Sequence, residues 1–279
     1  MHISSLPSPY GVGTLGKAAR EFADFLAKSG QRSWQMLPIC PTGFGDSPYQ
    51  SYSTFAGNPY FIDLDQLCAD GLLEPQDYQG IDWESPPDRV NYGALYQKRY
   101  PVLRKAALRL LSQPNASFDA FCNENGWWLD DYALFMALKD AENGRPSWEW
   151  EAPIRRREEG ALAVALENYA QQIAVWKVYQ YLFFRQWDAL KAYVNGLGIQ
   201  IIGDLPIYVS RDSVDVWATP SLFQLYENGN PVDVAGCPPD GFSATGQLWG
   251  NPLYDWDHMA QDGYSWWMGR IEYLCKVYD

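Results

Sequence analysis

The strongest constraint on the fold is an isoleucine-rich run that follows a long helical pattern. The run "IQIIGDLPIYV", residues 199–209, is typical of a parallel strand that is covered on both faces. Residues 166–198, just before it, carry apolar residues at helical spacing and end on glycines. An earlier apolar run bounded by prolines, "RSWQMLPICP" at residues 32–41, predicts another buried strand. Strand, helices and strand in this order predict an α/β architecture.

Helical patterns account for most of the remaining chain. Residues 17–30 predict an amphipathic helix that stops at Gly30, a residue suited to the position after a helix end. From about residue 63 to residue 193 the signals are mainly helical, and residues 263–279 resume that pattern. The opening "HISS", residues 2–5, is consistent with the end of an earlier strand.

One long segment shows neither a helical nor a strand period. Residues 212–256 are rich in Gly, Pro, Asn and aromatic residues. A loop of this length is uncommon in a compact protein and is usually functional or disordered. Its Trp and Phe content favours an ordered, functional loop.

Composition limits the class of ligand. The chain has 279 residues, of which 47% are hydrophobic, enough for a substantial core. Aromatic residues make up 16%, with 13 Trp and 19 Tyr, and flat aromatic faces are surfaces on which sugars bind. The net charge of −13 argues against a nucleic acid partner, since phosphate binding needs clustered Lys and Arg. An uncharged substrate is compatible with this charge.

Several other classes of site are poorly supported. His2 and His258 lie far apart without neighbouring ligands, so a metal site is not expected. There is no GxSxG or Walker motif, and "GVGTLG" lacks the acidic residue of a dinucleotide site. No apolar run approaches the roughly 20 residues that span a membrane, and the start lacks signal-peptide features, so we expect a cytoplasmic protein. Five scattered cysteines indicate free thiols: Cys40, Cys68, Cys122, Cys237 and Cys275.

Carboxylates are therefore the main candidates for chemistry. Asp204 follows the predicted buried strand, where barrels and open sheets place functional groups. Position alone leaves two interpretations equally open, a functional acid or an acceptor for loop amides or a nearby arginine. For Asp212 and Asp215 the structural interpretation is favoured, as a helix N-cap and a solvated loop acid.

The loop after the other predicted strand has a similar character. Residues 43–61, "GFGDSPYQSYSTFAGNPYF", offer hydroxyl, amide and carboxylate groups that can hydrogen-bond sugar hydroxyls, and Tyr faces that can stack on sugar rings. The alternative is an ordinary loop whose aromatics fill the core. Two such loops at the ends of two parallel strands favour a site. The candidates here are Asp46, Tyr49, Gln50, Ser51 and Tyr60.

Four long stretches in order resemble one enzyme family. They are "HISSLPSPYGVGTLG", "GDSPYQSYSTFAGNPYFIDL", "GDLPIYVSRDSVDVW" and "GCPPDGFSATGQLWGNPLYDW", which together span nearly the whole chain. They resemble the amylomaltases, the 4-α-glucanotransferases of glycoside hydrolase family 77. The resemblance implies transfer of α-1,4-glucan segments to a new 4-hydroxyl by a retaining double displacement, with a carboxylate nucleophile and a second carboxyl group as acid and base. It implies no cofactor and no metal.

The resemblance also implies the architecture. It predicts part of a (β/α)₈ TIM barrel, about the first three strands, with a large helical insertion. In the family pattern "HISSLP" would be the end of the first strand, "SWQMLPI" the second strand and "IQIIGDLPIYV" the third. Residues 1–62 would hold the first two strands and a substrate loop, and 63–165 the mainly helical insertion. Residues 166–279 would hold a barrel helix, the third strand, a long glucan-covering loop and a further helix.

Site residues follow from the same resemblance. Asp204 resembles an aspartate that supports the active-site arginine and the nucleophile, while Tyr49 and Ser51 resemble donor-side sugar contacts. The nucleophile Asp and the acid/base Glu are expected beyond Asp279, so the chain alone is expected to be an inactive fragment and at best marginally folded. The loop that would cover the glucan and disfavour water contributes Asp240, Phe242, Gln247 and Trp249.

Two alternatives remain open on the sequence. One is an α-glucan hydrolase on the same barrel, which the long covering loop disfavours. The other is a non-catalytic glucan-binding module.

Overall fold

The computed structural model describes residues 1–86 and 88–279, and a short parallel strand pair organises it. Strand β1 (Ser33–Gln35) pairs with β2 (Gln200–Ile202), with Trp34 opposite Ile201. Those two central residues are buried, whereas Ile202 is 47% exposed. The α/β prediction is confirmed in this coarse sense, but the prediction of a strand covered on both faces is wrong here. Strand β2 ends at Ile202, and Pro206, in the second half of the predicted run, could not donate to a ladder.

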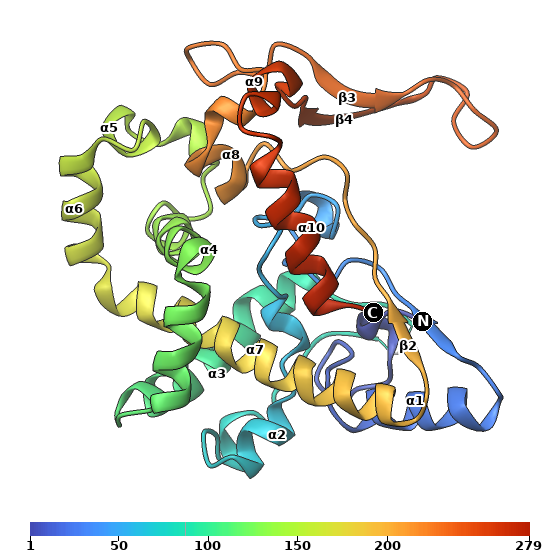
Figure 1. Cartoon of the computed structure of the whole chain (residues 1–279). Helices are drawn as coiled ribbons and strands as arrows, with labels where there is room; N and C mark the ends of the chain where they lie inside the picture. Colours follow the sequence, from blue (N-terminus) through green and yellow to red (C-terminus); the bar gives the residue numbers. More distant parts are fainter. Residues whose placement is uncertain (87) are drawn as a thin grey trace.

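Helices make up most of the molecule (Figure 1). Several helices begin after an Asn, Asp or Ser whose side chain accepts a hydrogen bond from a backbone N–H of the first turn. Asn91 caps α3 in this way, and Asn115 caps α4. The helices are α1 (Lys17–Lys28), α2 (Leu64–Ala69), α3 (Tyr92–Leu111), α4 (Ala116–Ala141), α5 (Ala152–Arg155), α6 (Glu159–Asn168), α7 (Ala170–Gly196), α8 (Val214–Ala218), α9 (Trp256–Ala260) and α10 (Ser265–Val277).

The predicted helical regions are confirmed, and the opening residues differ from their prediction. Gly30 follows the end of α1 with a φ of +73°, as expected for a glycine at that position. The opening "HISS" is not a strand: Ile3–Ser5 form a 3₁₀ turn, because Leu6 N donates back to Ile3 O at 3.1 Å. That local bond replaces a ladder bond.

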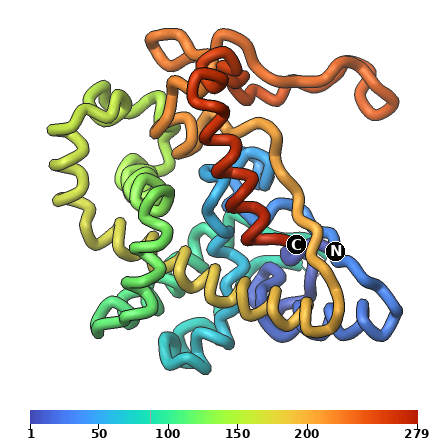
Figure 2. The backbone as a smooth tube through the Cα atoms, viewed as in Figure 1, coloured from blue at the N-terminus to red at the C-terminus, as the bar shows by residue number. Residues whose placement is uncertain are grey.

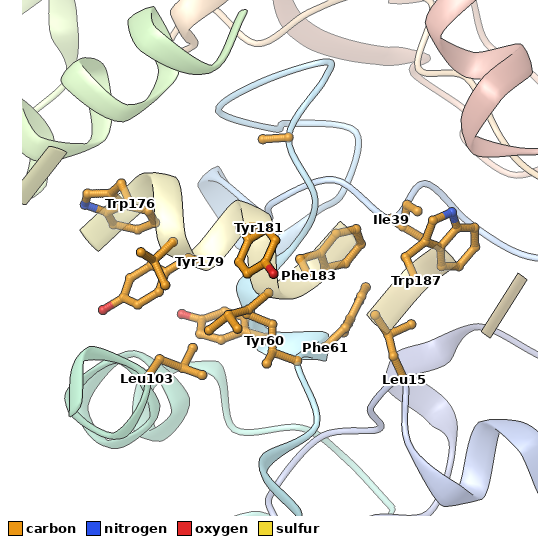
Figure 3. Close-up of a cluster of buried hydrophobic side chains, with 14 of the residues drawn as sticks. Leu15, Ile39, Tyr60, Phe61, Leu103, Trp176, Tyr179, Tyr181, Phe183 and Trp187 are labelled. Atoms are coloured by element: carbon orange, nitrogen blue, oxygen red, sulfur yellow. The ribbon is translucent and has the colours of Figure 1, made fainter. Parts of the chain in front are cut away.

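The core lies where α7 meets α4, α3 and the chain segment after β1. Aromatic side chains dominate it, and Figure 3 shows Tyr60, Phe61 and Phe183 packed between these elements. Gly57 has to be a glycine, since a Cβ there would lie 2.0 Å from the ring of Phe183. Helix α7 is apolar around much of its circumference, which is typical of a helix buried on most sides.

Two buried glutamines of α7 fix the end of the loop at residues 43–61, the candidate substrate loop, and the residue Asp63 after it. Gln180 accepts from Gly57 N at 2.8 Å and donates to Gly57 O at 2.9 Å. Gln186 does the same for Asp63, at 2.6 and 3.1 Å. Each carboxamide therefore satisfies both backbone groups of one residue, as a neighbouring strand would do.

The segment predicted to lack any regular period contains regular structure. Strands β3 (Val234–Cys237) and β4 (Gln247–Pro252) form an antiparallel hairpin with a register shift between Val234 and Gly236. Helix α8 precedes it. The hairpin projects from the body of the molecule (Figures 1 and 2), so its strands are not buried on one face and do not show the alternating pattern of a half-buried strand.

Among the described residues, no helix is long and apolar enough to cross a membrane.

Candidate active site

A side-chain hydrogen bond joins the loop that follows β1 to the loop that follows β2. Tyr49 Oη donates to Asp204 Oδ2 at 2.6 Å, joining residues 155 positions apart. They come together because β1 and β2 are parallel neighbours, so both loops leave the same edge. Burial and the bond to Asp204 raise the pKa of Tyr49 to about 12, so the phenol remains a donor at neutral pH.

A groove runs between the substrate loop and the hairpin. Its volume is about 520 Å³, within the range of small-molecule sites. Tyr49 is 41% and Trp249 43% exposed, so both rings remain accessible there. Tyr208 lies 6.3 Å from Trp249 between ring centroids and extends the aromatic surface. The groove is lined by Ser47, Tyr49, Gln50, Leu205, Pro206, Ile207, Tyr208, Gln247, Trp249 and Asn251.

Ser51 lies deeper than the groove. Together with Tyr49 and Asp204 it lines a small inner cavity of about 40 Å³. Its hydroxyl donates to Ser53 O at 2.8 Å and accepts from Ser53 N at 3.2 Å. In this arrangement the Ser51 hydroxyl holds the loop in shape.

Asp240 and Phe242 lie at the far end of the hairpin, in the turn between β3 and β4. The carboxylate of Asp240 accepts from Phe242 N and Ser243 N, each at 2.8 Å, so it stabilises the turn. The Phe242 ring is fully exposed. Of the four predicted residues of the covering loop, Gln247 and Trp249 therefore line the groove, while Asp240 and Phe242 do not.

The two acids that follow Asp204 in the chain, Asp212 and Asp215, are not an N-cap and a solvated acid. Asp215 is buried and accepts from Thr54 N at 3.0 Å and from Thr54 Oγ1 at 2.8 Å. Burial raises its pKa. Asp212 accepts from the buried Lys139 Nζ at 2.6 Å, and Ser213 caps α8 instead. Sequence position missed both roles because the partners lie more than 70 residues away.

Two further candidates of the substrate loop, Tyr60 and Asp46, lie away from the groove. Tyr60 is buried and packs against Tyr100 with ring centroids 5.4 Å apart, which is the core-filling role. Asp46 is exposed on a short 3₁₀ turn and has a φ of +57°. Neither residue lines the groove or the inner cavity.

Arg270 is a site residue that sequence reasoning missed. It is 1% exposed, and it lines the inner cavity with Asp204. Its guanidinium donates to Pro206 O at 2.5 Å and Ile207 O at 3.3 Å, just after Asp204. A charged residue within the aromatic "SWWMGRIEY" was the available signal.

Among the described residues, no group of three or more His, Cys, Asp or Glu is placed to hold a metal ion.

Family membership follows from comparison with known proteins. The profile of glycoside hydrolase family 77, described as 4-alpha-glucanotransferase, matches residues 1–279. The chain belongs to this family. The 4-alpha-glucanotransferase of Clostridium butyricum is 48% identical over 280 residues, and that of Thermus thermophilus is 50% identical over 282. Both alignments cover 100% of this family 77 chain.

Solved structures agree with the sequence comparison. The amylomaltase of Streptococcus agalactiae, solved in complex with acarbose, is 46% identical, covers 100% of this family 77 chain and gives a TM-score of 0.97. The amylomaltase of Corynebacterium glutamicum is 19% identical, with a TM-score of 0.75 over 99% of the chain, and shows the shared fold. The present chain spans 58% and 55% of the two curated relatives named above, and 57% of the streptococcal amylomaltase chain.

Proposed function

We propose that this chain forms the glucan-binding part of a 4-α-glucanotransferase active site. The observation that carries the proposal is the groove in which Tyr49 faces Gln247 and Trp249 next to the Tyr49–Asp204 bond. Aromatic faces beside amide and hydroxyl groups suit a sugar chain, which presents apolar ring faces and many hydroxyls. The substrate class is an α-1,4-glucan such as a maltooligosaccharide. The acarbose bound to the related amylomaltase supports this class.

The reaction is transfer with retention at the anomeric carbon. Such a mechanism uses two carboxyl groups about 5–5.5 Å apart, one as nucleophile and one as acid and base. Of the described residues that line the groove and the inner cavity, Asp204 is the single acid. We therefore assign Asp204 a supporting role, with Tyr49 as its hydrogen-bond donor, and assign the nucleophile and the acid/base to residues outside 1–279. No cofactor takes part in this chemistry.

The hairpin is the segment that covers the glucan. Gln247 and Trp249 of β4 contact the sugar, while Asp240 holds the turn that presents the exposed ring of Phe242. A cover of this kind excludes water from the glycosyl-enzyme intermediate, which favours a sugar acceptor over hydrolysis. The relatives named above are transferases, so no observation here favours the hydrolase or the binding module.

The architecture that goes with this function is part of a (β/α)₈ barrel. The parallel β1–β2 pair with helices between them supports it. Asp279 N donates to Ile201 O at 3.1 Å, which is the bond expected where a further parallel strand begins beside β2. We keep the division into 1–62, 63–165 and 166–279 as a proposal, with the helical insertion packed through α4 on α7.

Binding of maltoheptaose to the 279-residue chain, followed by isothermal titration calorimetry, tests the proposal. We expect Trp249→Ala to weaken binding by about tenfold or more, because a buried aromatic face contributes on the order of 1–3 kcal/mol. Phe25→Ala is the matched control, since Phe25 is an exposed aromatic of α1 away from the groove. Equal affinities for the two variants would contradict the proposed groove.

A further inference from the structure

Two carboxamides join the walls of the groove. Gln50 Nε2 donates to Asn251 Oδ1 at 2.8 Å and to Trp249 O at 3.1 Å. Asn251 Nδ2 donates to Val209 O at 2.7 Å and lies 3.5 Å from Gln50 Oε1. The substrate loop, the segment after β2 and strand β4 therefore meet at these two side chains, which we call the Gln50–Asn251 amide pair.

The amide pair joins two parts of the chain that are far apart in the sequence. Its members are 201 positions apart, so it forms only when the base of the hairpin lies against the substrate loop. Asn251 is 3% exposed, and its carboxamide oxygen and nitrogen both have partners in this arrangement. A buried amide without partners is costly, so loss of Gln50 disfavours the docked position of the hairpin.

The backbone of β4 needs such a restraint at this point. Gly250, between Trp249 and Asn251, has a φ of +78°. A glycine in this conformation interrupts the regular alternation of a strand and is freer to rotate than other residues. The position of Trp249 therefore depends on contacts on either side of Gly250, and its indole Nε1 also donates to Gln247 Oε1 at 3.0 Å. The bonds from Gln50 to Trp249 O and Asn251 Oδ1 hold both sides.

We propose that the Gln50–Asn251 amide pair positions Trp249 opposite Tyr49 and so determines the affinity of the groove for a glucan chain. Gln50 and Asn251 are positioning residues: they act through Trp249 and through the docking of the hairpin. The effect on glucan binding rests on the proposed function, whereas the effect on hairpin docking stands without it.

Hydrogen–deuterium exchange of the 279-residue chain tests hairpin docking without any ligand. The variants are Gln50→Leu, Asn251→Leu and the double variant, with Gln113→Leu as control, since Gln113 is exposed after α3. We expect peptides from residues 234–252 to exchange roughly tenfold faster in Gln50→Leu, as loss of two hydrogen bonds predicts. The double variant exchanges no faster than the faster single variant, because the pair acts as one unit.

Calorimetry with maltoheptaose tests positioning. Gln50→Leu is expected to weaken binding roughly threefold to tenfold, in keeping with one or two lost hydrogen bonds. In a Trp249→Ala background the same Gln50→Leu change has no further effect if it acts through Trp249. A purely structural role would weaken binding equally in both backgrounds and would overturn the positioning role.

The remaining outcomes separate the two proposals. The docking role of the amide pair is overturned if hydrogen–deuterium exchange of the hairpin is unchanged in Gln50→Leu. It is also overturned if the hairpin of the unsubstituted chain shows no protection from exchange. Absence of maltoheptaose binding to the unsubstituted chain overturns the proposed function and the affinity role of the pair. Faster hairpin exchange in the same experiment would still support docking by the pair.

Discussion

At the scale of single residues, burial decides what a polar side chain does. Asp215 and Asp212 differ by three positions, yet one is buried against Thr54 and the other pairs with Lys139. Arg270 is buried because its guanidinium has backbone carbonyls to bind and two indole rings beside it, Trp266 and Trp267. Each role depends on a partner from another element.

His2 gives a pH prediction at this scale. Burial, and secondarily the charge of the amino terminus, lower its pKa from 6.5 to about 4. The unfolded chain therefore binds a proton that the folded chain does not, so stability is fully present above about pH 6.5 and falls as pH decreases toward 4. At about pH 5 the loss attributable to His2 is about 2 kcal/mol, from 1.36 kcal/mol per pKa unit.

Urea unfolding at pH 7.5 and at pH 5 measures this contribution. We expect His2→Gln to remove about 2 kcal/mol of the pH-dependent loss, in keeping with the shift in His2 pKa. The same substitution at the exposed second histidine, His258→Gln, is the matched variant. An identical pH dependence in all three proteins would show that His2 titrates alike in both states.

At the scale of elements, two side chains of helix α7 bind the backbone of the segment after β1 as a neighbouring strand would. Helix α7 satisfies the backbone of Gly57 and Asp63 through Gln180 and Gln186. The helical pattern of this region predicted the helix, but it gave no indication that two of its glutamines serve the substrate loop. That arrangement keeps the loop after β1 at a fixed position relative to the core.

The substitution Gln186→Leu tests this element. It leaves the buried N–H of Asp63 without a partner, which costs about 1–3 kcal/mol, while Asp63 O still accepts from Leu67 N at 3.3 Å. We expect a decrease of about 1–3 kcal/mol in the free energy of unfolding, measured by urea denaturation. Gln171→Leu, at an exposed position of the same helix, should change stability by less than about 0.5 kcal/mol. Comparable effects of the two variants would refute the backbone role of Gln186.

At the scale of the whole molecule, one core extends from Ile3 to Val277, while the strand pair keeps exposed apolar positions. Ile202 of β2 is 47% exposed, and Ile207, in the segment after β2, is 63% exposed. Both chain ends lie at the same strand pair, since Trp34 Nε1 donates to Met1 O and Asp279 N donates to Ile201 O (Figure 1). Exposed strand faces of this kind lower stability until they are covered.

The 279-residue chain alone is predicted not to transfer glucose units between maltotriose molecules. The reason is that its described cavities offer Asp204 and no second carboxyl group. Chromatography of the products after incubation with maltotriose measures transfer, and the full-length Thermus thermophilus 4-alpha-glucanotransferase provides the positive control. Detectable glucose together with longer oligosaccharides would contradict this prediction.

The sequence by itself determined the helices, the two loops that follow the parallel strands and the family. Those features depend on local periodicity, turn residues and long ordered motifs, which are all contiguous in the chain. Only the tertiary structure decided that Tyr49 binds Asp204, that Trp249 shares their groove while Phe242 does not, and that Gln50 meets Asn251. These contacts join positions 155 to 201 apart, and their energies depend on burial and geometry that no local pattern encodes.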